Sequence, residues 1–251
     1  MKKVLIISFL IISNFVWAQG PDSLFVKANK LYQSEKYDEA LNLYNKIDQA
    51  GLQSDLLYYN IANAYYKLNK VASAIYYYEK ALLLNPNNDD ARFNLGFAKR
   101  MAIDNIEPLP KTFSQKINEN IILKLTYNTW AWVAVGLSFL FAILFLLYHF
   151  SYNSLYKRIY FITGNISALL AIVTIAFAYQ NYNYASTHID AIIFAQQTDV
   201  KSAPTKSSEV NFELHEGTKV EVLESLDNWK KIKIADGRIG WLIADDLKVL
   251  Q

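Results

Sequence analysis

The feature that most constrains this chain is a pair of long stretches without charge. Residues 129–150 and 159–180 are each 22 residues long and contain no Asp, Glu, Lys or Arg. At about 1.5 Å per residue a helix of this length measures about 33 Å, which is enough to cross the hydrocarbon core of a bilayer. The two stretches therefore predict two transmembrane helices.

The connection between these stretches fixes how they are arranged. Residues 151–158 are too few for anything but a short turn, so the two helices should form an antiparallel hairpin with both outer ends on one side of the membrane. Lys157 and Arg158 lie in this turn and suit a cytoplasmic face, because cytoplasmic loops carry an excess of basic residues.

The N-terminal segment 1–18 is typical of a secretory signal peptide. Lys2 and Lys3 are followed by an apolar run that ends in Val16-Trp17-Ala18, with small residues at the positions that a signal peptidase requires. The alternative is an uncleaved membrane anchor. In either case residue 20 onward is exported, which predicts a bacterial inner-membrane protein with its N-terminal and C-terminal domains in the periplasm.

The segment between the signal and the first apolar stretch contains an internal repeat. Ala28 and Tyr44 recur as Ala62 and Tyr78, displaced by 34 positions, and such a period is typical of helical repeat proteins. These residues resemble the tetratricopeptide repeat over residues 21–105, in about two and a half copies. The resemblance implies helical hairpins whose small residues lie where helices cross. Because solenoid units share their cores with neighbours, so short an array should need a partner or the membrane surface to complete it.

The same resemblance implies a concave groove, lined by the first helix of each hairpin, that binds peptides. Asparagine side chains can read a peptide backbone and aromatic rings can hold its side chains, although several of these rings are equally explained as core between helices. The expected groove residues are Phe25, Asn29, Tyr32, Tyr59, Asn60, Asn63, Tyr66, Phe93 and Phe97.

Residues 106–128 form a linker with one amphipathic segment. Phe113, Ile117 and Ile121 recur every four residues with polar residues opposite, as in a helix that lies in the headgroup plane of a membrane. A short core helix of the preceding module is the alternative.

From residue 190 to the end of the chain the apolar period changes to two, as in Val220-x-Val222, which predicts half-buried strands. The turns between them and a Gly-Trp pair ending at Trp241 make this segment similar to bacterial SH3 domains, a small all-β barrel. In that family the domain often binds cell-wall peptides, so Trp229 and Trp241 are candidate stacking residues. A domain this small also needs large core residues, which favours their burial.

The composition argues against several other function classes. There are 25 Lys plus Arg against 23 Asp plus Glu, so no broad basic field favours nucleic acid. The chain has no Cys and its three His are far apart, which argues against thiol chemistry, a catalytic triad and a histidine metal site. No phosphate loop, nucleophile elbow or dinucleotide fingerprint is present. We therefore expect no enzyme activity, no metal and no cofactor.

These segments together predict a multidomain membrane protein. Its parts are an all-α tetratricopeptide-repeat solenoid, a two-helix transmembrane hairpin and a small all-β SH3-like barrel. This order of parts resembles the BatE-like proteins of Bacteroides aerotolerance (Bat) operons. The resemblance implies a scaffold that works with membrane proteins bearing von Willebrand A domains and with a MoxR-type ATPase, in stress or oxygen tolerance. The alternative is a wall-binding or wall-sensing protein whose SH3-like domain contacts peptidoglycan.

Overall fold

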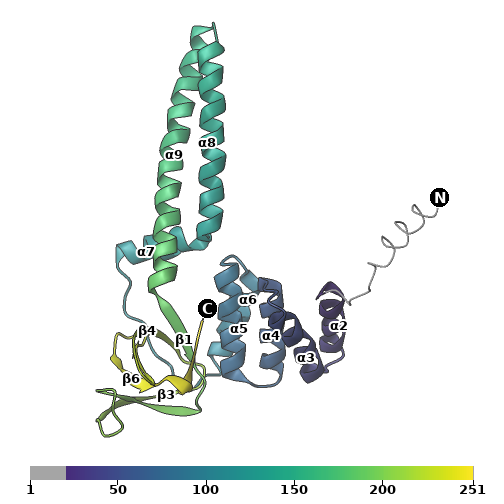
Figure 1. Cartoon of the computed structure of the whole chain (residues 1–251), viewed down its shortest axis with the longest axis vertical. Coiled ribbons are helices and arrows are strands. Elements are labelled where there is room, and N and C mark those ends of the chain that lie inside the picture. Colours follow the sequence, from purple (N-terminus) through teal and green to yellow (C-terminus); the bar gives the residue numbers. More distant parts are fainter. Residues whose placement is uncertain (1–20, 251) are drawn as a thin grey trace, which may run out of the picture.

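The computed structural model describes residues 21–250, and the expected signal peptide lies outside them. A row of helices comes first, and it is followed by a long helical hairpin and then by a β-sheet that packs back against the row (Figure 1). The row consists of α2 (Pro21–Gln33), α3 (Tyr37–Gln49), α4 (Asp55–Lys67), α5 (Val71–Leu84) and α6 (Asp89–Lys99).

The helices of the row pack as the 34-residue period predicts. Ala28 and Ala62 are fully buried where helices cross, and the rings of Tyr44 and Tyr78 are buried between helices. The turns inside the two hairpins also repeat, because Glu35 and Asn69 both adopt positive φ, at 61° and 59°. The prediction of a helical repeat region is confirmed.

The C-terminal segment forms an antiparallel sheet in the strand order β3-β2-β6-β5-β4-β1-β7. Here the expectation of a small barrel needs correction, because the sheet is not closed. The short strand β7 pairs with β1, and β3 at the other edge pairs with β2. The strands are β1 (Ile189–Ile193), β2 (Gln197–Lys201), β3 (Val210–His215), β4 (Lys219–Leu226), β5 (Trp229–Lys233), β6 (Ile239–Ile243) and β7 (Leu247–Val249), with the 3-10 turn η2 (Ala244–Asp246) before the last.

Helices α8 (Tyr127–Phe150) and α9 (Ser154–Thr187) form the hairpin and are long and apolar enough to cross a membrane. Helix α9 begins inside the segment expected to be the turn, because Asn153 caps it by accepting a hydrogen bond from the Leu155 amide at 2.9 Å. The two helices pack closely through Gly164 and Ser167, whose hydroxyl donates to the Leu137 carbonyl at 2.8 Å.

The linker braces the base of the hairpin. It forms α7 (Phe113–Asn120) and the 3-10 turn η1 (Ile122–Lys124), and α7 lies across the hairpin axis (Figure 1). The buried Asn181 amide of α9 donates to the carbonyls of Ile122 and Leu125 at 2.9 and 2.7 Å. The amphipathic helix therefore packs at the hairpin and not in the core of the repeat module.

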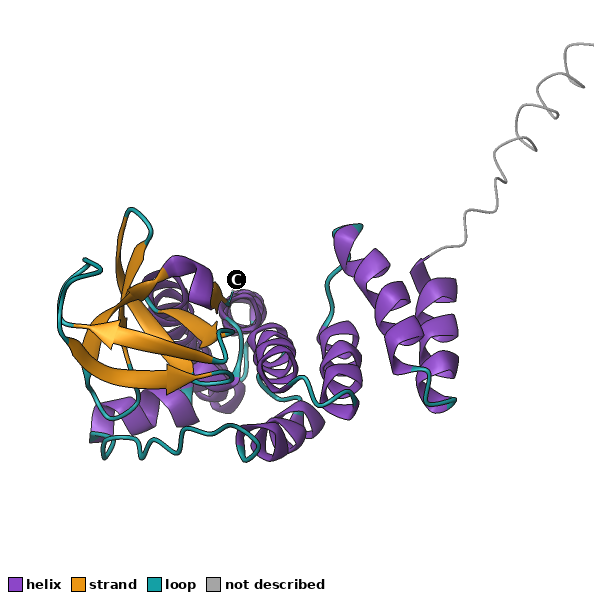
Figure 2. Ribbon diagram, turned by 90° about the horizontal axis from the view of Figure 1, so that it is seen from below, coloured by secondary structure: helices purple, strands orange, loops and turns teal. Residues whose placement is uncertain are grey.

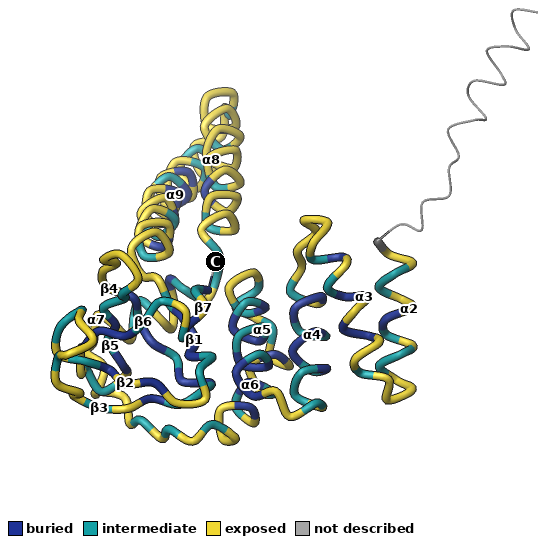
Figure 3. Tube along the Cα trace, turned by 60° about the horizontal axis from the view of Figure 1, so that its bottom comes forward, coloured by how far each residue is buried: buried dark blue, intermediate teal, exposed yellow. Residues whose placement is uncertain are grey.

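The sheet covers the last helices of the row, which a repeat array otherwise leaves open. Ile192 of β1 and Leu250 belong to the same apolar cluster as the repeat helices, and Tyr76 of α5 packs edge-on against Phe194 with ring centres 5.7 Å apart. Gly217 approaches α5 so closely that a Cβ atom there would lie 3.0 Å from Ile75. Figure 3 shows buried chain on both sides of this joint, and Figure 2 shows the helices extending sideways from the sheet.

An ion network crosses the same joint. The carboxylate of Glu79, which is 8% exposed, contacts the ammonium groups of Lys219 at 3.0 Å and Lys99 at 2.7 Å, and Lys219 also contacts Asp190 at 2.8 Å. Burial alone would raise the pKa of Glu79, but the two neighbouring ammonium charges outweigh it and hold this pKa below its ordinary value of 4.5. The charged carboxylate therefore stabilises the joint at neutral pH.

A second carboxylate, Asp104, ties the chain after α6 to the turn between β3 and β4. It accepts hydrogen bonds from the Thr218 hydroxyl at 2.6 Å and from the His215 amide at 2.7 Å. Burial opposes ionisation, yet these hydrogen bonds lower the pKa of Asp104 below its ordinary value of 3.8. Together the two carboxylates join residues more than 100 positions apart in sequence.

We expect Glu79→Gln to loosen this joint at pH 7. Because the carboxylate has two charged partners, its loss should lower the free energy of opening of α5 and β1 amides by about 2–3 kcal/mol, measured by hydrogen exchange on the full chain in detergent. The carboxylates have lowered pKa values, so their contribution is full above pH 4.5, the ordinary pKa of Glu, and disappears on acidification.

The difference between Glu79→Gln and the parent chain should therefore shrink as the pH falls below 4.5. The control is Glu39→Gln, which removes an exposed pair with Lys36 and should leave α5 unchanged. Equal protection of α5 and β1 in all three proteins at pH 7 would contradict the role given to Glu79.

Candidate functional site

The inner face of the repeat helices carries two copies of one hydrogen-bonded unit. In the first, Asn29 Oδ1 accepts from the Tyr44 hydroxyl at 2.6 Å and from the Asn60 amide at 3.0 Å. In the second, Asn63 Oδ1 accepts from the Tyr78 hydroxyl at 2.5 Å, and the equivalent of Asn60 donates at 2.9 Å. These asparagine oxygens are thus bound within the fold, where they join successive helices.

The equivalent of Asn60 in the second unit is Asn94 of α6, which also donates to the Tyr59 hydroxyl at 3.3 Å. Burial raises the pKa of Tyr44 to about 12, and burial likewise raises the pKa of Tyr78. Both phenols therefore stay protonated at physiological pH and act as donors. The hydrogen-bonded units themselves carry no charge.

A pocket of about 290 Å³ opens beside the second unit and is lined by side chains of helices α2, α4, α5 and α6. It brings together four of the expected groove residues, namely Tyr32, Asn63, Tyr66 and Phe97. The complete lining is Tyr32, Asn63, Tyr66, Lys67, Tyr78, Asn94 and Phe97. An aromatic pocket with one ammonium group and two side-chain amides can hold a side chain of a bound peptide and bind its backbone carbonyls.

Sequence reasoning missed three lining residues, although a signal for two of them was present. Lys67 lies four positions after Asn63 on the same helix, so it shares its face. Asn94 lies 34 positions after Asn60 and so occupies the same place in the next repeat. Tyr78 recurs in sequence as part of the 34-residue repeat, and its ring both packs between helices and lines the pocket.

Three further expected groove residues, all aromatic, are not part of the lining of this pocket. Phe25 packs against Tyr44 with ring centres 5.9 Å apart, and Tyr59 packs against Tyr78 at 6.2 Å. Phe93 is 67% exposed and meets the ring of Phe97 edge-on at 4.9 Å. Of these rings, Phe93 is the most available to a partner.

The two tryptophans of the sheet have separate environments. Trp241 is buried, with the Lys231 ammonium 5.7 Å from its ring centre. Trp229 instead lines an open pocket of about 390 Å³ with Thr198, Asp199 and Asp246 among its neighbours. Only Trp229 is therefore placed to stack on a ligand.

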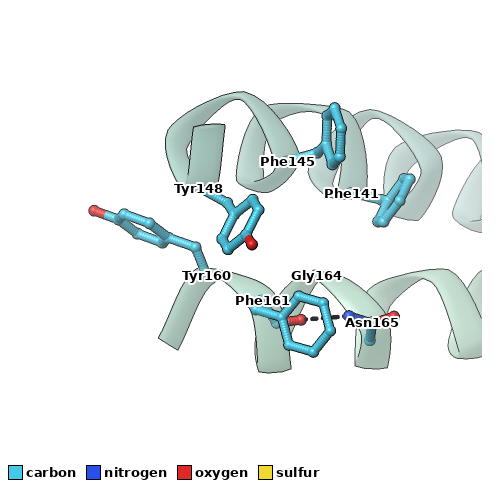
Figure 4. Close-up of a pocket in the computed structure, with 7 residues that line it drawn as sticks. All are labelled: Phe141, Phe145, Tyr148, Tyr160, Phe161, Gly164 and Asn165. Atoms are coloured by element: carbon cyan, nitrogen blue, oxygen red, sulfur yellow. Dashed lines mark hydrogen bonds between the residues drawn. The ribbon is translucent and has the colours of Figure 1, made fainter. Parts of the chain in front are cut away.

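A third pocket lies between α8 and α9 near their turn and is shown in Figure 4. Its volume is about 170 Å³, and aromatic rings such as Phe141 and Tyr148 line most of it. Asn165 is its one amide, and this amide donates to the Phe161 carbonyl of its own helix at 2.7 Å. No charged side chain is among the residues that line this pocket.

Within residues 21–250, no group of three or more His, Asp or Glu side chains is placed to hold a metal ion.

Comparison with known families finds two domains. Residues 56–88 match the tetratricopeptide repeat, and residues 197–248 match the bacterial SH3 domain. No curated protein matches the chain. The chain thus contains a repeat of a kind that binds proteins and a domain of a kind found in bacteria.

The hydrogen bond between Asn63 and Tyr78 in the second unit can be tested by a double-mutant cycle. Asn63→Ala should lower the free energy of opening of α4 and α5 by about 1–3 kcal/mol, because it leaves the buried Tyr78 hydroxyl without its acceptor. Tyr78→Phe removes the donor, so the double variant should lose less than the sum of the single variants. Hydrogen exchange measures the free energy of opening in the two single variants and in the double variant. If the losses in the single variants add up to the loss in the double variant, the hydrogen bond does not couple the two residues.

Proposed function

We propose that this protein is a non-enzymatic scaffold of a bacterial inner membrane that presents a protein-binding repeat groove and an SH3-like domain in the periplasm. The single observation that carries the proposal is the aromatic pocket around Phe97 and Lys67, which opens on a module joined to the sheet. The tetratricopeptide and bacterial SH3 matches support a binding role.

The finer proposal is membership of a Bat-type complex. In that setting the groove binds a segment of a partner membrane protein with a von Willebrand A domain, and a MoxR-type ATPase acts on the assembly in stress or oxygen tolerance. The order of parts in the chain supports this, and no catalytic step is assigned to it.

The groove part of the proposal predicts a loss of partners on mutation. Phe97→Ser with Lys67→Glu should abolish co-purification of membrane proteins in mild detergent, because both side chains line the pocket without belonging to the hydrogen-bonded units. The matched control is Leu226→Ser with Lys230→Glu, an apolar and a basic residue on the sheet. If the parent chain is recovered alone, or if both variants keep the same partners, the scaffold proposal is overturned.

The topology part predicts a labelling pattern, which is simple to test because the chain has no Cys of its own. Single cysteines at Lys36 and Ser207 should react with a membrane-impermeant maleimide in cells with a permeabilised outer membrane. A cysteine at Tyr152, which is fully exposed in the turn of the hairpin, should react only after lysis. Labelling of Tyr152→Cys before lysis, in cells with only the outer membrane permeabilised, would contradict the orientation.

A second candidate function is favoured by the pocket at Trp229. Its combination of an indole ring with Asp199, Lys201 and Asp246 suits a small polar ligand such as a cell-wall peptide. Under this proposal Trp229→Ala, but not Phe97→Ser, removes binding of the full chain to purified peptidoglycan. The absence of any retention of the parent chain would eliminate this alternative.

A further inference from the structure

Four exposed leucines gather at one end of the repeat helices. Leu52 and Leu56 flank the start of α4 and are 44% and 57% exposed, while Leu83 and Leu84 end α5 and are 54% and 42% exposed. We call these four residues the leucine patch. An apolar patch on an otherwise polar helix end is a sign of an interaction site.

Hydrogen bonds hold the two halves of the leucine patch together. The carboxylate of Asp55, between Leu52 and Leu56 in sequence, accepts from the Asn85 amide at 2.8 Å and from the Asn88 amide at 3.2 Å. Asn85 directly follows Leu84. The loop before α4 and the loop after α5 therefore form one continuous surface.

This surface lies on the side of the module that the hairpin occupies. In Figure 1 the end of α5 that leads into α6 points in the direction of the hairpin and reaches the level of α7 at its base. Figure 2, which views the molecule from below, shows the repeat helices extending sideways from that base. Helix α7 begins at Phe113, which is 80% exposed.

We propose that the leucine patch inserts into the headgroup region of the same bilayer that the hairpin crosses. The inference rests on the membrane placement given under the proposed function. A planar bilayer whose surface lies at α7 would continue over the ends of α4 and α5 and meet the patch. Burial of apolar side chains at the boundary between headgroups and acyl chains then stabilises the contact.

The charges near the leucine patch identify the kind of lipid contact. Asp89 and Asp90 begin α6 at the same end and are exposed. Negative side chains do not favour anionic headgroups, so the contact depends on apolar insertion and should persist at high salt. The repeat module is then held at two places: the bilayer holds the leucine patch, and the sheet holds α5.

The test uses spin labels on single cysteines in the full chain, reconstituted in phosphatidylcholine nanodiscs. The labelled positions are Leu56 and Leu83 in the patch, Ile103 as an aqueous control that is 70% exposed, and Phe139 of α8 as a bilayer control. Collision with oxygen and with a water-soluble nickel complex reports the depth of each label.

Labels at Leu56 and Leu83 should show higher oxygen and lower nickel accessibility than the label at Ile103, with an immersion of about 5–10 Å. Nickel accessibility at the patch equal to that at Ile103, with Phe139 immersed, would overturn the inference alone. An aqueous label at Phe139 would instead remove the membrane placement itself. Dipolar broadening between labels at Leu83 would show that a second copy of the chain covers the patch, which also overturns the inference.

Discussion

The structure depends on the contact between the last repeat helices and the sheet. Lys219 lies between Glu79 of α5 and Asp190 of β1, and Ile192 completes the apolar cluster of the helices. A repeat array of this length buries too little on its own, because each unit shares its core with a neighbour. Here a second domain of the same chain serves as that neighbour. The partner or membrane surface expected to complete the array is thus supplied, at this end, from within the chain.

Much of this fold is predictable because local patterns encode it. The 34-residue period places Ala28 and Ala62 at helix crossings, and the absence of charge over residues 129–150 marks the first hairpin helix. The contact between the domains was not predictable in the same way. Glu79 and Lys219 are 140 positions apart, and each reads in sequence as an ordinary surface residue. The open sheet was missed for a related reason, since turn positions predict strands but do not determine which edges pair.

The candidate groove shows a different limit. Helical periodicity predicts that Asn29 and Asn63 lie on the groove face, but it does not reveal that their oxygens are already bound by Tyr44 and Tyr78. The same residue types serve peptide recognition and helix joining, and the choice between them depends on the neighbouring helix. Exposed rings such as Phe93, together with Lys67, are therefore better candidates for contact with a partner than the asparagines are.

The hairpin and the groove are mechanically connected through one short stretch of chain. Helix α9 ends at Thr187 and β1 begins at Ile189, so only His188 separates the hairpin from the strand that packs on α5. The ring of His188 stacks on Tyr184 of α9, with centres 3.9 Å apart, and lies 3.8 Å from Glu221 of β4. The ion pairs of Lys219 with Asp190 and Glu79 then join β1 to α5. The hairpin, the sheet and the last repeat helices are therefore connected by contacts that all lie close to β1.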